Sequence, residues 1–255
     1  RYPPDEAAQQ ALIWRVGELN PARPAWPRRA ADKKPLRVGL VSADLRKHPV
    51  GYFLRDVLLA LASTAVASGE LTLLAYANHA LADELTQDIR PAFAAWHTVD
   101  LWSDAGLEAQ IRSDEIDILV DLSGRTAGNR LPVFAAKPAP VQVSWLGYFA
   151  TTGLQQMDAI LADPVCVPMG EESLYVEKVL RLPHTRLCMS PPGVTEPPAA
   201  PPVLTNGFIT FGCFQTLPKI NAGVLAAWAQ ILNACPQSRL RLQAPQLNDE
   251  GQRAR

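Results

Sequence analysis

The stretch LRVGLVSADLRKHPVGYF, from Leu36 to Phe53, decides the fold of this chain. An apolar run from Leu36 to Val41 gives way to a polar loop, and an amphipathic helical pattern follows that loop. A strand that feeds a helix in this way is typical of the first unit of a parallel α/β sheet. Ligands bind such sheets at the carboxyl ends of the strands, where this loop lies. Asp44 and His48 in the loop are therefore the first candidate functional residues.

The alternation of strand and helix continues along the chain with short polar connections, which predicts βαβ units and a largely parallel, Rossmann-like sheet. Ser103 is a suitable N-cap for one of the helices, and Gly69 lies where another would end. We expect strands at residues 36–42, 71–77, 97–100, 116–122, 141–146, 157–162 and 178–182, and helices at residues 50–67, 81–95, 104–114 and 129–136.

Proline-rich segments divide the chain into four parts. Tyr2–Leu19 has the apolar spacing of an amphipathic helix, and a Pro/Arg-rich linker follows it to Pro35. A helix with no partner ahead of such a linker indicates an upstream region. The main α/β domain occupies residues 36–190, a second proline-rich linker residues 191–206, and the beginning of a second doubly wound domain residues 207–255. In that last part we expect strands at 208–214 and 239–244, and helices at 220–234 and from Asp249 onward.

Composition narrows the class of protein. The 255 residues are 48% hydrophobic and 19% charged, as in a globular chain, and the formal net charge of −1 gives no general attraction for nucleic acid. The longest apolar stretch, Val57–Ser68, falls short of the ~20 residues that span a bilayer, so no membrane partner is expected. The four cysteines have neither the spacing of a zinc site nor that of a disulfide scaffold, which predicts reduced thiols and a cytoplasmic protein.

Each candidate in the first loop also has a plain structural interpretation. His48 titrates near neutrality, so it is suited to hydrogen bonding or proton relay beside a carboxylate. It is also compatible with a loop histidine that has no chemistry. Asp44 is suited to take a proton or to fix the histidine tautomer, but aspartate is also a common turn or capping residue.

Two more loops follow predicted strands at the same edge of the sheet. The loop Ser123–Arg130 carries Arg130, whose side chain is suited either to an anionic or polar ligand or to solvent. The segment Trp145–Gly153 places aromatic rings around a glycine, a pattern that fits a core or a surface where backbone amides approach a sugar.

A fourth loop lies in the second domain. GCFQTLPKI, from Gly212 to Ile220, again runs from strand through polar loop to helix, and Lys219 should stand at the start of the helix that begins near Ile220. Backbone amides and the helix dipole favour a phosphate there. The alternative is an exposed lysine.

These loops, in this order, resemble the catalytic region of protein O-linked N-acetylglucosamine (O-GlcNAc) transferases, particularly bacterial ones. The resemblance rests on four motifs and covers nearly the whole chain from Leu36. Phe149 stands where the family usually has proline, and Pro218 precedes the lysine. The motifs are LRVGLVSADLRKHPVGYF, ILVDLSGRTAGNRLPVFAAKPAPVQVSWLGYFATTG, MDAILAD with the later PHT, and FGCFQTLPKI.

The resemblance implies a GT-B glycosyltransferase, of which this chain holds the N-terminal Rossmann-like half and an incomplete second Rossmann-like domain. It implies transfer of N-acetylglucosamine from the donor substrate UDP-GlcNAc to Ser or Thr hydroxyls, with inversion and without a metal or cofactor. The implied partners are protein or peptide acceptors, upstream tetratricopeptide (TPR) repeats and a C-terminal catalytic half.

The resemblance also assigns residues. His48 and Asp44 correspond to residues considered as the base, and Lys219 would contact the diphosphate. The remaining implied substrate contacts, together with Arg130 from the second loop, are Leu146, Gly147, Phe149, Gln215 and Thr216. The alternatives are a noncatalytic half that binds an acceptor or effector, and a GT-B transferase with a non-protein acceptor.

Overall fold

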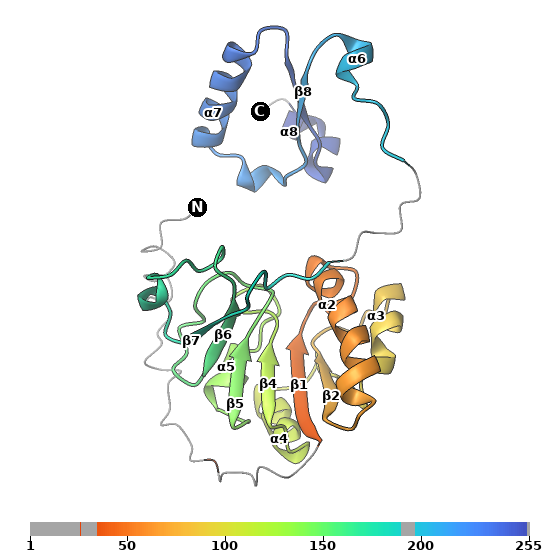
Figure 1. Ribbon diagram of the computed structural model, residues 1–255, viewed down its shortest axis with the longest axis vertical. Helices are drawn as coiled ribbons and strands as arrows, with labels where there is room; N and C mark the ends of the chain where they lie inside the picture. Colours follow the sequence, from red (N-terminus) through yellow and green to blue (C-terminus); the bar gives the residue numbers. More distant parts are fainter. Residues whose placement is uncertain (1–25, 27–34, 190–196, 254–255) are drawn as a thin grey trace. The chain divides into compact units, whose positions relative to one another are not determined.

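The computed structural model describes residue 26, residues 35–189 and residues 197–253 (Figure 1). The chain divides into two compact units, Arg1–Pro192 and Gly193–Arg255. The predicted helix Tyr2–Leu19 lies outside the described residues, as does most of the linker to Pro35. The division into four parts stays a prediction.

The first unit is built on a seven-stranded sheet in which every pair of neighbours is parallel (Figure 1). The strand order is β3-β2-β1-β4-β5-β6-β7, so the chain builds outward from β1 and then crosses to β4 on its other side. This is a Rossmann-like strand order, and the parallel sheet that we predicted is confirmed. The strands are β1 (Leu36–Ser42), β2 (Leu71–Ala77), β3 (Ala95–Thr98), β4 (Ile118–Asp121), β5 (Val141–Ser144), β6 (Ala159–Ala162) and β7 (Lys178–Arg181).

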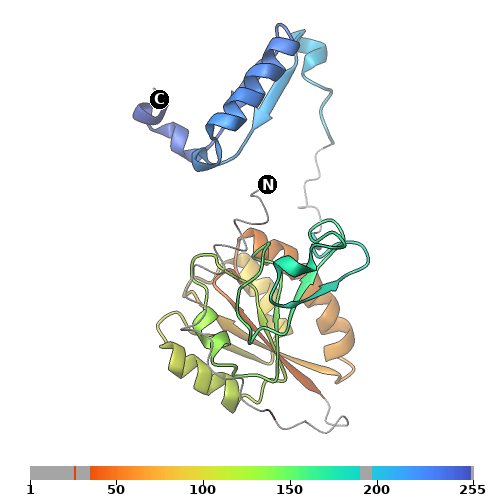
Figure 2. The same ribbon diagram turned by 90° about the vertical axis from the view of Figure 1, so that its left-hand side faces the viewer.

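Helices cover both faces of this sheet (Figure 2). One core cluster joins the sheet to α2 (Pro49–Leu61) and α3 (Glu84–Ile89), which a 3₁₀ turn extends over Arg90–Ala92. The other joins it to α4 (Asp104–Ser113) and α5 (Leu131–Ala135). A further 3₁₀ turn, Glu172–Leu174, precedes β7. The strands are short and apolar because helices bury them from both sides.

One helical run among the described residues is long and apolar enough to cross a membrane, judged by length and composition alone. It is Pro49–Val66, with a mean hydropathy of 1.3, because a π-helical turn over Ala62–Val66 continues α2. The helical run is longer than the apolar stretch Val57–Ser68 because it also takes in the segment before it, which contains Arg55 and Asp56. α2 buries Val50, Leu54 and Leu58 on one face, as core helices of globular α/β domains do. The absence of a membrane partner stays a prediction.

The second unit repeats the strand-helix-strand pattern. β8 (Thr210–Cys213) pairs in parallel with β9 (Arg239–Leu242), and α7 (Ala222–Ala234) connects them. Short helical turns complete the unit: α6 (Val203–Asn206), 3₁₀ turns over Leu217–Lys219 and Pro245–Asn248, and α8 (Glu250–Arg253).

α6 lies within the segment that we expected to be an irregular linker. Prolines are compatible with the start of a helix, where their missing N–H has no partner to lose, and Pro202 is the N-cap of this one. Gly207 ends it with φ of 71°, a left-handed conformation that glycine adopts at little cost.

Candidate functional site at the carboxyl edge of the sheet

The loop after β1 is shaped as the start of α2. His48 is the N-cap: its Nδ1 accepts a hydrogen bond from the backbone N–H of Val50 at 3.3 Å, and Pro49 occupies the first helical position. The backbone N–H of Asp44 donates to Ser42 Oγ at 2.9 Å. The capping role that we considered for Asp44 is therefore taken by His48, while Asp44 lies in the loop between β1 and α2.

The same loop brings the two candidate catalytic side chains together. Nδ1 of His48 lies 3.5 Å from Oδ2 of Asp44, and an Arg46 guanidinium nitrogen lies 3.6 Å from the other carboxylate oxygen. Asp44 is only 7% exposed, whereas the His48 side chain is 39% exposed. The arrangement therefore offers a nearly buried carboxylate beside an accessible imidazole.

The two contacts of His48 Nδ1 need different protonation states. When Nδ1 accepts from Val50, the proton of the neutral ring is on Nε2, which is then a hydrogen-bond donor. When Nδ1 carries a proton toward Asp44, Nε2 of the neutral ring has a free lone pair. The Val50 contact favours the first state.

The loop after β4 begins on a buried carboxylate that the sequence analysis did not single out. Asp121 is fully buried and accepts hydrogen bonds from the backbone N–H groups of Ser123, at 3.0 Å, and Gly124, at 2.9 Å. Burial raises the pKa of Asp121 to about 6, and the negative charge of Glu177 acts in the same direction. Asp121 thus fixes the start of the loop that leads to Arg130.

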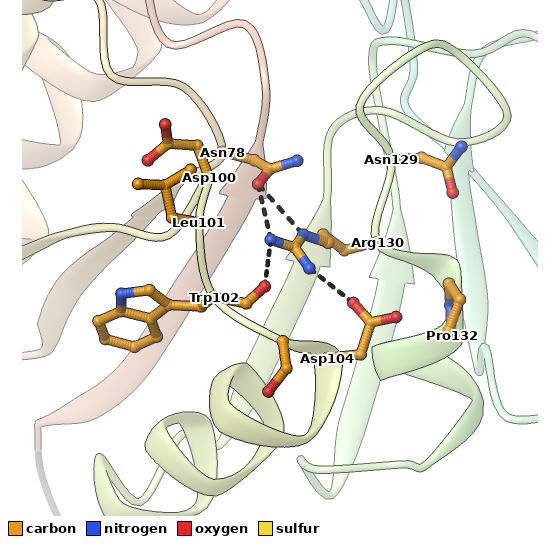
Figure 3. A pocket seen from close by; sticks show the side chains of 9 residues that line it. Asn78, Asp100, Leu101, Trp102, Asp104, Asn129, Arg130 and Pro132 are labelled. Atoms are coloured by element: carbon orange, nitrogen blue, oxygen red, sulfur yellow. Dashed lines mark hydrogen bonds and ion pairs between the residues drawn. The ribbon is translucent and has the colours of Figure 1, made fainter.

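Arg130 forms the wall of a pocket of about 670 Å³ (Figure 3). Its Nε and Nη2 donate to Asn78 Oδ1 at 3.1 and 3.0 Å, and its Nη1 pairs with Asp104 at 2.7 Å. Nη2 also donates to the carbonyl oxygens of Val99, at 2.6 Å, and Trp102, at 2.9 Å. The side chain is 12% exposed. In this structure Arg130 therefore ties together the ends of β2, β3 and α4, and its expected contact with substrate stays a prediction.

The loop after β5 opens with a tight turn. The backbone N–H of Gly147 donates to the Trp145 carbonyl at 2.9 Å, and Leu146 between them has φ of 75°. A Cβ on Gly147 would overlap the carbonyl oxygen of Leu122, so only glycine fits there. Leu146 is buried in the core, whereas Phe149 is 55% exposed. Of these three predicted sugar and acceptor contacts, Phe149 is the one whose side chain is open to a ligand.

The loop after β4 touches both of the other loops. A Cβ on Gly128 would lie 2.8 Å from the Ala43 side chain, and one on Gly124 would overlap Tyr148. Arg125 of the β4 loop also donates to the carbonyl of Thr152 in the β5 loop, at 3.2 and 2.9 Å. The candidate residues of the first unit therefore lie on adjoining loops at one edge of the sheet.

A second buried carboxylate, also missed in the sequence, braces the β5 loop. Glu177 is 4% exposed and accepts from the Thr151 hydroxyl at 2.6 Å and from the Thr152 backbone N–H at 2.7 Å, and it also pairs with the Thr152 hydroxyl. An acidic residue within the apolar stretch before β7 could have indicated a buried carboxylate. Its hydrogen-bond partners could not be predicted, because they lie about 25 residues earlier in the chain.

The remaining candidates belong to the second unit. Lys219 is exposed and ends the 3₁₀ turn Leu217–Lys219, and α7 begins at Ala222 with Asn221 as its N-cap. The helix starts two residues later than expected, because the Asn221 side chain accepts from the Val224 N–H at 3.1 Å. Gln215 and Thr216 are exposed as well. Their convergence with the first-unit loops stays a prediction.

Within the part of the chain that the structure describes, no group of three or more His, Cys, Asp or Glu side chains is arranged to hold a metal ion. The four cysteines are all free thiols.

A family model described as glycosyl transferase family 41 matches residues 15–189, which include all three loops of the first unit. This chain belongs to glycosyl transferase family 41. Among its relatives, the probable UDP-N-acetylglucosamine–peptide N-acetylglucosaminyltransferase SPINDLY of Solanum lycopersicum is 36% identical over 230 residues, which cover 89% of this chain and 24% of the relative. The corresponding enzyme SEC of Arabidopsis thaliana is 30% identical over 217 residues, 82% of this chain and 22% of the relative.

The fold of this family 41 chain is also similar to that of a solved structure. A mutant of the O-GlcNAc transferase of Thermobaculum terrenum matches with a TM-score of 0.87 and 39% identity, over 99% of this chain and 47% of that one. The resemblance to O-GlcNAc transferases and the GT-B half predicted from the sequence are confirmed. The chain spans about a quarter of the length of these curated relatives.

Proposed function

We propose that this protein transfers N-acetylglucosamine from UDP-GlcNAc to Ser or Thr hydroxyls of proteins or peptides. The observation that carries the proposal is the match to family 41 across the three loops that adjoin at the carboxyl edge of the sheet. Parallel α/β sheets bind their ligands at this edge. The names of the relatives, which specify UDP-GlcNAc and a peptide, favour this function over a noncatalytic half or a non-protein acceptor.

Asp44 is our candidate for the general base, acting directly or through a water molecule. The Val50 N–H favours the His48 state in which Nε2 donates, so the carboxylate is the better proton acceptor of the pair. His48 Nε2 would then donate a hydrogen bond to the acceptor or sugar. A general base typically contributes on the order of 10² to 10⁴ in rate.

In the same proposal, Lys219 and the N-terminal turn of α7 stabilise the departing diphosphate. A cation beside a helix N-terminus favours an anion through both its charge and the unpaired backbone N–H groups. Gln215 and Thr216 would contact the donor beside it. We propose an inverting reaction that needs neither a metal nor a cofactor, with TPR repeats and the C-terminal catalytic half as partners. A cytoplasmic location is supported by the four free thiols.

The test uses the full-length protein. Tritiated UDP-GlcNAc and UDP-glucose are offered with a Ser/Thr peptide, the same peptide with alanine at those positions, and a lipid acceptor, each with and without EDTA. We expect label from UDP-GlcNAc on the Ser/Thr peptide alone, unchanged by EDTA and β-linked by NMR. Transfer to the lipid would contradict the proposed protein acceptor, and an α-linked product would contradict inversion. Loss of transfer with EDTA would contradict metal independence. No transfer at all would contradict the proposed function.

A further inference from the structure

The turn after β5 holds a side chain in a strained backbone conformation. Leu146 has φ of 75°, and the Gly147 N–H donates back to the Trp145 carbonyl across it. A γ-turn with positive φ is rare, and a bulky residue there is strained. The Leu146 side chain is 6% exposed and packs in the core, so its burial opposes relaxation of the turn.

Arg186 makes two hydrogen bonds to this turn, one through its side chain and one through its backbone. Its Nη1 donates to the Leu146 carbonyl at 3.2 Å, and its own carbonyl accepts from the Trp145 indole Nε1 at 3.0 Å. The Leu146 carbonyl is the one whose direction the left-handed conformation sets. The guanidinium therefore contacts the strained peptide itself.

Arg186 is in turn fixed to the neighbouring strand. Its backbone N–H donates to Asp163 Oδ2 at 2.9 Å, and its Nε contacts Cys166 Sγ at 2.9 Å. Asp163 directly follows β6 and is 4% exposed, and its hydrogen bonds from the Arg186 and Cys166 N–H groups hold its pKa below the usual value. The carboxylate thus stays ionised at neutral pH and anchors Arg186.

We propose that Arg186 is a positioning residue for glycosyl transfer. It holds the Trp145–Gly147 turn in its left-handed form and so fixes the β5 loop, which carries Gly147 and Phe149 at the same edge of the sheet as Asp44 and His48. The inference rests on the proposed function of this site. A displacement of about 1 Å in a reacting geometry can cost on the order of 10² in rate, so a small relaxation of this turn is enough to slow transfer.

The test is Arg186→Gln, with Arg186→Lys as the conservative variant. Arg181→Gln is a matched control, because Arg181 also donates to backbone carbonyls, those of Val167 and Pro168, but not to the β5 loop. We expect kcat to fall about 10- to 100-fold for Arg186→Gln with the KM for UDP-GlcNAc within about twofold. Arg186→Lys should recover part of kcat, and Arg181→Gln should keep wild-type kcat.

A second measurement separates positioning from folding and from the proposed function. Hydrogen exchange at the amides of residues 147–149 should accelerate in Arg186→Gln and in Trp145→Phe, which removes the indole N–H, and stay at the wild-type rate in Arg181→Gln. Unchanged exchange there, or unchanged kcat in Arg186→Gln while the wild type transfers, would overturn the inference. A wild type without transfer would instead refute the proposed function and leave the exchange result to decide whether Arg186 holds the turn.

Discussion

The imidazole Nδ1 of His48 lies 3.5 Å from Asp44 Oδ2 and, at the same time, caps α2 through the Val50 N–H. One ring nitrogen therefore serves the helix and faces the carboxylate. Removal of the ring can reduce activity because the imidazole is lost from the reaction site or because α2 loses its N-cap. Different substitutions are needed to separate these two effects.

His48→Asn should keep the cap and remove the imidazole, because asparagine is a good N-cap residue. His48→Ala should lose both, at a cost of about 0.5 to 2 kcal/mol in the free energy of unfolding. We expect both variants to slow transfer to a similar degree, on the order of 10² to 10³ for a lost hydrogen-bond donor. Denaturant unfolding and label transfer measure the two effects. Transfer by His48→Asn at the wild-type rate would reduce His48 to a cap, and Lys47→Ala in the same loop is the control.

Asp121 makes stability depend on pH. Its pKa is about 6 in the folded protein and roughly 3.9 when unfolded. Between these values the folded state binds more protons, so the contribution of Asp121 to stability is full below pH 4 and is lost as the pH rises through 6. At 1.4 kcal/mol per pKa unit the loss is on the order of 2 to 3 kcal/mol.

Asp121→Asn should remove this pH dependence. The free energy of unfolding of the wild type minus that of the variant should therefore decrease between pH 4 and pH 7, as followed by urea unfolding. Asp56→Asn on α2 is the control, and its difference from wild type should not follow this course. A constant difference for Asp121→Asn would show that Asp121 ionises normally.

Arg130 is expected to matter for stability. Arg130→Ala leaves Asp104 and two backbone carbonyls without their donor, which should lower the free energy of unfolding by about 2 to 4 kcal/mol. Arg130→Lys should recover little, since one ammonium group cannot reach all these acceptors. Arg90→Ala, which removes a guanidinium 5.6 Å from the Trp96 ring, should cost about 0.5 to 1 kcal/mol. A stable Arg130→Ala protein with a raised KM for donor or peptide would instead support a substrate contact.

Gly147→Ala tests the packing of the β5 loop. The added Cβ overlaps the Leu122 carbonyl, so either the loop or the end of β4 must shift. We expect a loss of transfer together with a lower midpoint of thermal unfolding. Gly106→Ala, in the first turn of α4, places its Cβ 3.3 Å from the Ser103 hydroxyl, a tight contact that a small shift relieves, so it should cost much less than Gly147→Ala. Wild-type stability and transfer in Gly147→Ala would mean that the loop has room that this structure does not show.

The predictable part of the fold was its periodic part. The apolar run Leu36–Val41 and the later apolar runs predicted strands within a few residues of those observed. Strands that are buried on both faces have continuous apolar sequences, which are easy to recognise. The short helix Val203–Asn206 was not predicted, because a proline-rich sequence usually indicates the absence of regular structure. Proline is nevertheless compatible with the start of a helix. Asn221 was a readable cap signal for α7.

The location of the candidate site could be predicted from the sequence, but the contacts of its side chains could not. The loops with Asp44, His48 and Arg130 lie where parallel strands end. The partners of Arg130 lie 26 and 52 residues away in sequence, so its engagement in the pocket wall left no local signal. Leu146 gave no sign of a left-handed conformation, since leucine rarely adopts one and tertiary contacts hold it there.

We propose that the Asp44 carboxylate at the end of β1 and the Lys219 ammonium ahead of α7 serve one transfer reaction. The rate of label transfer from UDP-GlcNAc to a Ser/Thr peptide tests this in the full-length wild type, Asp44→Asn and Lys219→Ala, with Arg241→Ala as control. We predict losses on the order of 10² to 10⁴ for Asp44→Asn and 10² to 10³ for Lys219→Ala, and none for the control. Wild-type rates in both variants would contradict the participation of Asp44 and Lys219 in the transfer reaction.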